Sequence, residues 1–121
     1  MLKRDPVKYI RDKAKARYEK GTECEICGEV TDLDFHHFHG LSLLYHRWSA
    51  KHNLNEDDVV EHRDRFIAEH QEELYVHTAT LCHAHHLKLH SIYGKNPGLG
   101  TAPKQKRWVG IQKDKYGAVM D

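Results

Sequence analysis

The sequence predicts a small α+β fold that is mainly helical. Several stretches carry apolar residues spaced three or four positions apart, which is the pattern of an amphipathic helix. A single segment, Leu33 to His37, has the length and composition of a β-strand, although its alternation is brief. Two pairs of Cys and His side chains lie on either side of this segment. Because 121 residues bury a limited core, we expect one domain, residues 1–121, that these pairs help to hold together.

The first 21 residues are expected to form a basic helix. Asp5 can cap its N-terminus, and Pro6 can occupy the first helical position, where a missing N–H is tolerated. Gly21 can end the helix. Apolar residues recur at helical spacing between these ends, namely Val7, Ile10, Ala14 and Tyr18. Residues 1–20 carry a net charge of +5, so the solvent-facing side of this helix is expected to be basic.

Residues 22–94 are expected to form the core of the domain. A short turn over residues 22–31 contains the first Cys pair, and the strand at Leu33–His37 follows it. Gly40 is expected to end the strand. A helical insertion is then expected over about residues 41–75, because apolar residues return there at helical spacing.

The insertion is expected to hold two helices, and a further helix should follow it. The first helix covers about residues 42–52, and the second begins near Asn55 and Asp58, which resemble a capping box. The helix after the insertion is expected to begin near Leu81. It should reach about Tyr93, where a run of Gly and Pro breaks the pattern.

Charge is unevenly distributed along the chain. The formal net charge is only +1, but residues 55–73 carry −6 and residues 95–121 carry +4. The last segment, residues 95–121, is expected to be a basic arm or a short helix. Basic ends around an acidic middle could contact a phosphate backbone from two sides, although solvated surfaces would give the same pattern.

The composition is that of an ordinary globular protein, with 39% hydrophobic and 31% charged residues. No apolar run approaches the roughly 20 residues that span a bilayer. The first residues also lack the apolar core of a signal peptide. We therefore expect an intracellular protein without a membrane partner.

Three Cys and 12 His in so short a chain indicate a metal site. Three Cys cannot pair completely, and in a reducing compartment a C-x-x-C with a C-x-x-H favours metal over disulfide. Zinc takes four tetrahedral thiolate or imidazole ligands. The expected ligands of this structural Zn²⁺ are Cys24, Cys27, Cys82 and His85. Two alternatives remain at this point: the first Cys pair could close with His36 and His39, or it could be buried at a turn without metal.

Taken together, these motifs resemble the HNH endonucleases of the ββα-metal, or His-Me finger, group, in the branch that carries zinc. The resemblance covers about residues 22–94 and rests on the C-x-x-C turn, the histidine pair that ends the strand, and the helix after Leu81. The family helix usually begins C-x-x-C-H, so His85 replaces one Cys. The stretch 36–39, which reads HHFH, is also similar to phage junction resolvases of the endonuclease VII type.

The resemblance implies roles for five histidines. His37 would be the general base, for which an ordinary histidine pKa of about 6.5 is suitable near neutral pH. His36 and His86 would bind a catalytic divalent cation, with His36 in a position where the family more often has Asp. His77 occupies the position of the Asn that orients the base. His90 would contact the scissile phosphate or lie beside the ion.

The implied activity is metal-dependent hydrolysis of DNA phosphodiesters to 5′-phosphate and 3′-hydroxyl ends. Imidazole ligands favour Mn²⁺ or Ni²⁺ as the catalytic cation, and Mg²⁺ is possible. One alternative is a junction resolvase that is selective for DNA structure. Another is a non-catalytic zinc module that only binds nucleic acid, which would have no use for His37 beside His86.

Overall fold

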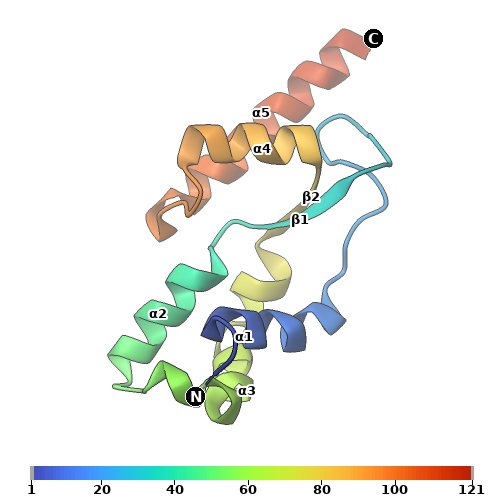
Figure 1. Cartoon of the computed structure of the whole chain (residues 1–121). Coiled ribbons are helices and arrows are strands. Elements are labelled where there is room, and N and C mark those ends of the chain that lie inside the picture. The colour runs from blue at the N-terminus through green and yellow to red at the C-terminus, as the bar shows by residue number, and fades with distance from the viewer. Residues whose placement is uncertain (1, 121) are drawn as a thin grey trace.

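The computed structural model describes residues 2–120 of the chain, and the side chains of residues 2–117. Three helices gather at one end of the molecule and two at the other, with a two-stranded sheet between them (Figure 1). The first group comprises α1 (Pro6–Ala14), α2 (Leu41–Lys51) and α3 (Val59–Glu69). The second group comprises α4 (His83–Tyr93) and α5 (Ala102–Met120). The strands are β1 (Leu33–His37) and β2 (Thr78–Cys82).

Short irregular helices connect these elements. They are η1 (Lys15–Arg17), η2 (Glu56–Asp58), the π-helical η3 (Glu72–Val76) and η4 (Leu99–Thr101). The predicted α+β class and the predominance of helix are confirmed. Within the described part of the chain, no helix is both long enough and apolar enough to cross a membrane.

The N-terminal helix begins as the sequence predicts but ends early. The Asp5 carboxylate accepts a hydrogen bond of 2.9 Å from the Val7 N–H, and Pro6 is the first helical residue. The α-helix ends at Ala14 rather than near Gly21, and Tyr18 is already extended, with φ −69° and ψ 131°. An extended backbone there places the Tyr18 ring on Phe35 of β1, with 4.6 Å between ring centroids. This stacking between Tyr18, which follows η1, and the sheet takes the place of the last predicted helical turn.

The sheet contains a strand that the sequence did not reveal. β1 and β2 pair antiparallel, from Leu33 opposite Cys82 to His37 opposite Thr78. The sequence predicts a helix from about Leu81, but α4 begins at His83, with Cys82 as its N-cap. Residues 79–82 are all buried, so both faces of β2 are covered and the strand shows no polar alternation. A short apolar run of this kind cannot be distinguished from a buried helix by its periodicity.

Two clusters of buried side chains lie at the two ends of the molecule. The first joins α1, α2 and α3, and its fully buried members include Ile10, Leu44, Tyr45, Phe66 and Leu74. Trp48 of α2 also belongs to this core. The second cluster joins the sheet, α4 and α5, and includes Cys24, Ile26, Leu81, Leu89, Ala102 and Val109. The second cluster is small, and two of its buried members are cysteines.

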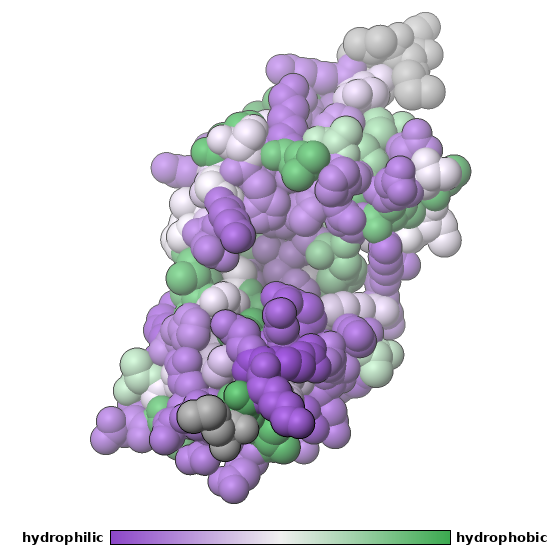
Figure 2. All heavy atoms as spheres, in the orientation of Figure 1, coloured by the Kyte–Doolittle hydropathy of each residue, from purple (hydrophilic) through white to green (hydrophobic). Residues whose placement is uncertain are grey.

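The surface is mainly hydrophilic on the face seen in Figure 2, where apolar side chains appear singly or in small groups. Two of the apolar side chains that do reach solvent lie on α4, namely Leu87 (56% exposed) and Ile92 (51%). Leu89, on the same helix, is completely buried. The helix therefore presents one leucine to the core and another to solvent.

This contrast gives a matched test of the second core. Leu89→Ala should lower the free energy of unfolding by ~2–5 kcal/mol, because it leaves a cavity in a small core. Leu87→Ala should change it by less than about 0.5 kcal/mol. Chemical denaturation of the zinc-loaded protein, followed by circular dichroism, measures both values. Equal effects of the two substitutions would contradict this packing of α4.

Candidate functional site

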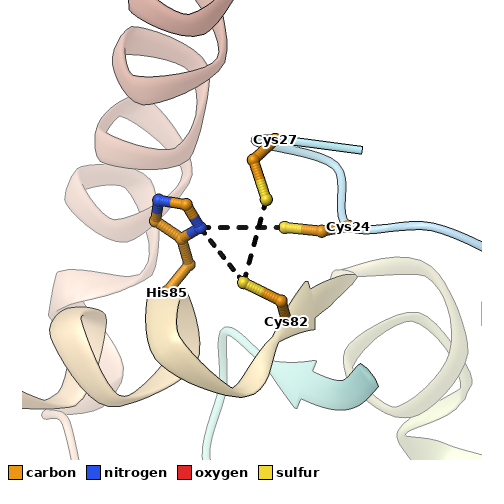
Figure 3. A group of neighbouring side chains, drawn as sticks. All are labelled: Cys24, Cys27, Cys82 and His85. Carbon is orange, nitrogen blue, oxygen red and sulfur yellow. Dashed lines mark hydrogen bonds between the residues drawn. The ribbon is translucent and has the colours of Figure 1, made fainter. Parts of the chain in front are cut away.

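The four predicted zinc ligands come together in the structure. Cys24 and Cys27 lie on the turn before β1, Cys82 ends β2, and His85 lies in the first turn of α4 (Figure 3). Their ligand atoms all lie within 4.8 Å of one another. The Sγ atoms of Cys27 and Cys82 are 3.9 Å apart, and Nδ1 of His85 is 3.2 Å from Sγ of Cys82 and 4.0 Å from Sγ of Cys24.

This donor set fits a tetrahedral Zn²⁺. With Zn–S bonds of about 2.3 Å, two thiolates of a tetrahedron lie about 3.8 Å apart, close to the separation found here. Cys24 and Cys82 are buried, at 2% and 7% exposure. Burial and the adjacent thiols raise the pKa of the Cys27 thiol, because a second thiolate in this space is unfavourable without a cation. A bound Zn²⁺ removes that penalty.

Backbone hydrogen bonds fasten the Cys turn to β2. The Cys24 N–H donates to the Glu29 carbonyl at 2.7 Å, which closes the turn, and Gly28 has the positive φ of 77° that the turn requires. The Glu25 N–H donates to the Thr80 carbonyl of β2 at 2.9 Å. The two halves of the site are therefore aligned by the backbone as well as by their ligands.

A second cluster consists of three histidines. His36 projects from β1, and His86 and His90 lie one turn apart on α4. Nε2 of His86 is 3.1 Å from Nδ1 of His36 and 3.0 Å from Nε2 of His90. The alternative zinc closure through His36 is excluded by this arrangement, because the His36 ring faces the other two histidines.

The outer nitrogens of this cluster face oxygen atoms. Nδ1 of His90 is 2.8 Å from the Gly94 carbonyl, and Nδ1 of His86 is 3.0 Å from the Asp34 carboxylate. A carbonyl or a carboxylate only accepts, so both Nδ1 atoms carry the proton. In the neutral imidazole, which carries a single ring proton, the Nε2 atoms of His86 and His90 are then unprotonated, and their lone pairs face each other at 3.0 Å. Convergent lone pairs of this kind suit a cation and repel one another without it.

Burial favours the form of His36 and His86 that binds metals. His36 is 3% exposed, and burial lowers its pKa to about 4. Burial also lowers the pKa of His86, partly offset by the hydrogen bond to Asp34. Neutral imidazole is the ligand form, so His36 is a competent ligand at neutral pH without losing a proton.

His37 lies on the opposite face of β1, as the alternation of a strand requires. Its Nε2 is 3.1 Å from the Leu74 carbonyl, and its ring packs edge-on against Tyr18 and Phe35. Burial lowers the pKa of His37 to about 4. The structure therefore does not bring His37 into direct contact with His86.

A surface pocket of about 180 Å³ nevertheless connects His37 with the three histidines. It lies between α1, β1, the start of α2 and α4. Its ionisable lining residues are Arg11, His36, His37, His86, His90 and Lys95. Two cationic side chains and four histidines therefore share one small hollow.

His77 does not join this pocket. It follows η3, and its Nδ1 is 2.7 Å from the Lys106 ammonium of α5. Its ring lies 5.5 Å from that of His39. Its backbone carbonyl accepts a hydrogen bond of 3.1 Å from the N–H of Phe38, the residue after β1. Among the described residues, His36, His86 and His90 are thus brought together, whereas His77 is turned towards α5.

Comparison with known protein families places this geometry in context. A family model described as the nicking endonuclease family, named after phage T5, matches residues 1–120. The chain belongs to the nicking endonuclease family. This match supports the expected phage nuclease, and it leaves the HNH assignment as a proposal. No solved structure matches the chain.

This member of the nicking endonuclease family has two site residues that were not predicted from the sequence. Asp34 accepts hydrogen bonds from His83 and His86, each at 3.0 Å. Burial raises the pKa of the Asp34 carboxyl, but these two hydrogen bonds lower it further, so the pKa lies below its ordinary value. Its position two residues before His36, on the same strand face, was a usable signal. Gln105 of α5 is 2.8 Å from Nε2 of His36. No sequence pattern marks it, because docking of α5 brings it there.

Alanine substitutions of the neighbouring residues His85 and His86 should have different effects on this member of the nicking endonuclease family. His85→Ala should abolish zinc binding and unfold the protein, since structural zinc contributes about 10–16 kcal/mol of binding free energy in small peptides. His86→Ala should retain the zinc and the fold. Elemental analysis of the purified proteins and thermal melts followed by circular dichroism measure both. Loss of zinc from the His86 variant would show that the two clusters are one site.

Proposed function

We propose that the chain is a metal-dependent DNA endonuclease that cuts one strand of a duplex. The observation that carries the proposal is the convergence of unprotonated nitrogens from His86 and His90, with Nδ1 of His36 beside them. This cluster opens into the pocket that holds His37 and Arg11. Membership of the nicking endonuclease family supports both DNA as the substrate and a cut in one strand.

His36, His86 and His90 would hold the catalytic cation. Their donor atoms lie within 4.8 Å of one another, and His86 is oriented from behind by Asp34. A divalent cation bound there would polarise a phosphate oxygen and stabilise negative charge on the phosphate and the leaving oxygen. His90 is thus proposed as a ligand of the ion rather than a group on the phosphate.

His37 is proposed as the general base. The Leu74 carbonyl can only accept, so Nε2 of His37 carries its proton and Nδ1 is the free acceptor. Burial lowers its pKa to about 4 rather than the ordinary value of about 6.5, so His37 is neutral throughout the neutral range but is a weaker base than an exposed histidine. His37 would take a proton from water as the water oxygen bonds to phosphorus. The bond from phosphorus to O3′ then breaks, and the departing O3′ takes a proton from solvent water, which leaves 5′-phosphate and 3′-hydroxyl ends.

Cationic side chains would hold the DNA against this pocket. Arg11 and Lys95 line it, and a neighbouring hollow of about 640 Å³ shares Lys95, His86 and His90 with it. His86 and His90 therefore line both hollows. The basic N-terminal segment and α5 extend the positive charge, and neutralisation of phosphates by Lys and Arg dominates non-specific DNA affinity.

Cleavage of supercoiled plasmid tests the proposal. The native protein with Mn²⁺ should convert supercoiled DNA to the open circle, and EDTA should prevent this. His37→Ala should reduce the rate by about 10²–10⁴-fold, the usual contribution of a general base. His46→Ala removes an exposed histidine of α2 and should leave the rate unchanged.

The products distinguish the alternatives. An unchanged nicking rate in the His37→Ala variant would contradict the role of His37 as the general base. Failure of the native protein to cut any DNA with any divalent cation, while still binding DNA, would favour the non-catalytic zinc module. Preferential cutting of four-way junctions over duplex would favour the resolvase.

The ligand set also predicts the order of metal preference. Three imidazoles are softer and carry less charge than the carboxylates that Mg²⁺ prefers. Nicking rates at matched cation concentrations should therefore be higher with Mn²⁺ or Ni²⁺ than with Mg²⁺. The zinc-loaded protein should be used throughout, so that the structural site stays filled. Equal or faster cutting with Mg²⁺ would contradict the proposed ligands.

A further inference from the structure

Gln105 is an uncharged polar side chain that is completely buried in the second core. It lies on α5 between Ala102 and Val109, which are buried in the same cluster. These three residues are three and four positions apart and so share one face of the helix. The packing of α5 therefore fixes the position of the Gln105 amide.

The orientation of this amide follows from its partners. The Gln105 nitrogen is 3.2 Å from the Phe38 carbonyl and 2.9 Å from the Thr101 hydroxyl. A carbonyl only accepts, so the atom facing it must be the NH₂ group. The Thr101 hydroxyl donates to the Gly98 carbonyl at 2.6 Å and is free to accept from the amide. The amide oxygen is thereby directed at His36.

The amide oxygen determines which nitrogen of His36 carries the proton. Oε1 of Gln105 is 2.8 Å from Nε2 of His36 and can only accept, so that nitrogen is protonated. Nδ1 of His36 is then left with its lone pair, 3.1 Å from Nε2 of His86. The opposite tautomer would place an N–H where a cation ligand is needed.

We propose that Gln105 is a positioning residue of the cation site, which fixes the tautomer and ring orientation of His36 from the C-terminal helix. The inference rests on the proposed function, because it requires the three histidines to bind a cation. It assigns to α5 a part in metal binding in addition to its basic surface. Hydrogen-bond partners of this kind are worth about 10–100-fold in metal affinity at other sites.

The native protein gives the first test. Long-range ¹H–¹⁵N NMR of the imidazoles, with zinc bound and no second cation, should show His36 protonated at Nε2. A His36 protonated at Nδ1 would overturn the proposal. This measurement needs no substitution in the core and is independent of any nuclease activity.

Three variants give the second test, by calorimetric titration of the zinc-loaded proteins with Mn²⁺ and Ni²⁺. Gln105→Leu keeps the volume but removes the acceptor, and should weaken cation binding about 10–100-fold. Gln105→Glu keeps an acceptor for His36 and should retain most of the affinity. Gln112→Leu makes the same change two turns further along α5 and should bind as the native protein does.

The comparison between variants separates positioning from mere packing. Glu, like Leu, loses the amide donor to the Phe38 carbonyl, so a purely structural role predicts the same loss of affinity for both. Equal affinities of the Leu and Glu variants, or native affinity in the Leu variant, would overturn the role of Gln105 and leave the proposed function standing. A native protein that binds no second cation would overturn the proposed function itself.

Discussion

The antiparallel pairing of β1 with β2 is the constraint on which both candidate metal centres depend. The register places Leu33 opposite Cys82, so α4 begins beside the strand that carries His36. The Cys turn precedes β1 and is fastened to β2 by the hydrogen bond between Glu25 and Thr80. One short two-stranded sheet thus aligns the four candidate zinc ligands and three histidines that are widely separated along the chain.

The two centres also share α4. His85 and His86 are consecutive residues, and a rotation of about 100° per residue turns them towards different sites. A zinc ion held by His85 therefore fixes the helix on which His86 and His90 lie. The candidate zinc site and the histidine cluster are therefore connected by the backbone of one helical turn. Cys24 and Cys82 also belong to the second core, so the candidate zinc site and the apolar side chains pack together.

The sequence predicted which four Cys and His side chains come together, because the spacing within each pair is local and needs no knowledge of the tertiary fold. The resemblance to a known family then separated His36 from His37, and strand alternation agrees with their placement on opposite faces. The strand at Thr78–Cys82 was missed because its burial on both faces erased the alternation. Asp34 and Gln105 acquire their partners only when α4 and α5 pack against the sheet. Local sequence patterns do not show how helices pack in the tertiary fold.

The long separation between the two Cys pairs has a consequence for how the molecule is made. Cys27 and Cys82 are 55 residues apart, and the acidic insertion between them contributes to a different core. During synthesis neither metal centre can close until the second half of the chain has left the ribosome. Contacts this far apart slow folding, and a growing chain carries the cysteines of the turn without their partners while the 55 residues up to Cys82 are added. The complete set of four candidate zinc ligands therefore becomes available late in synthesis, when Cys82 and His85 have been added.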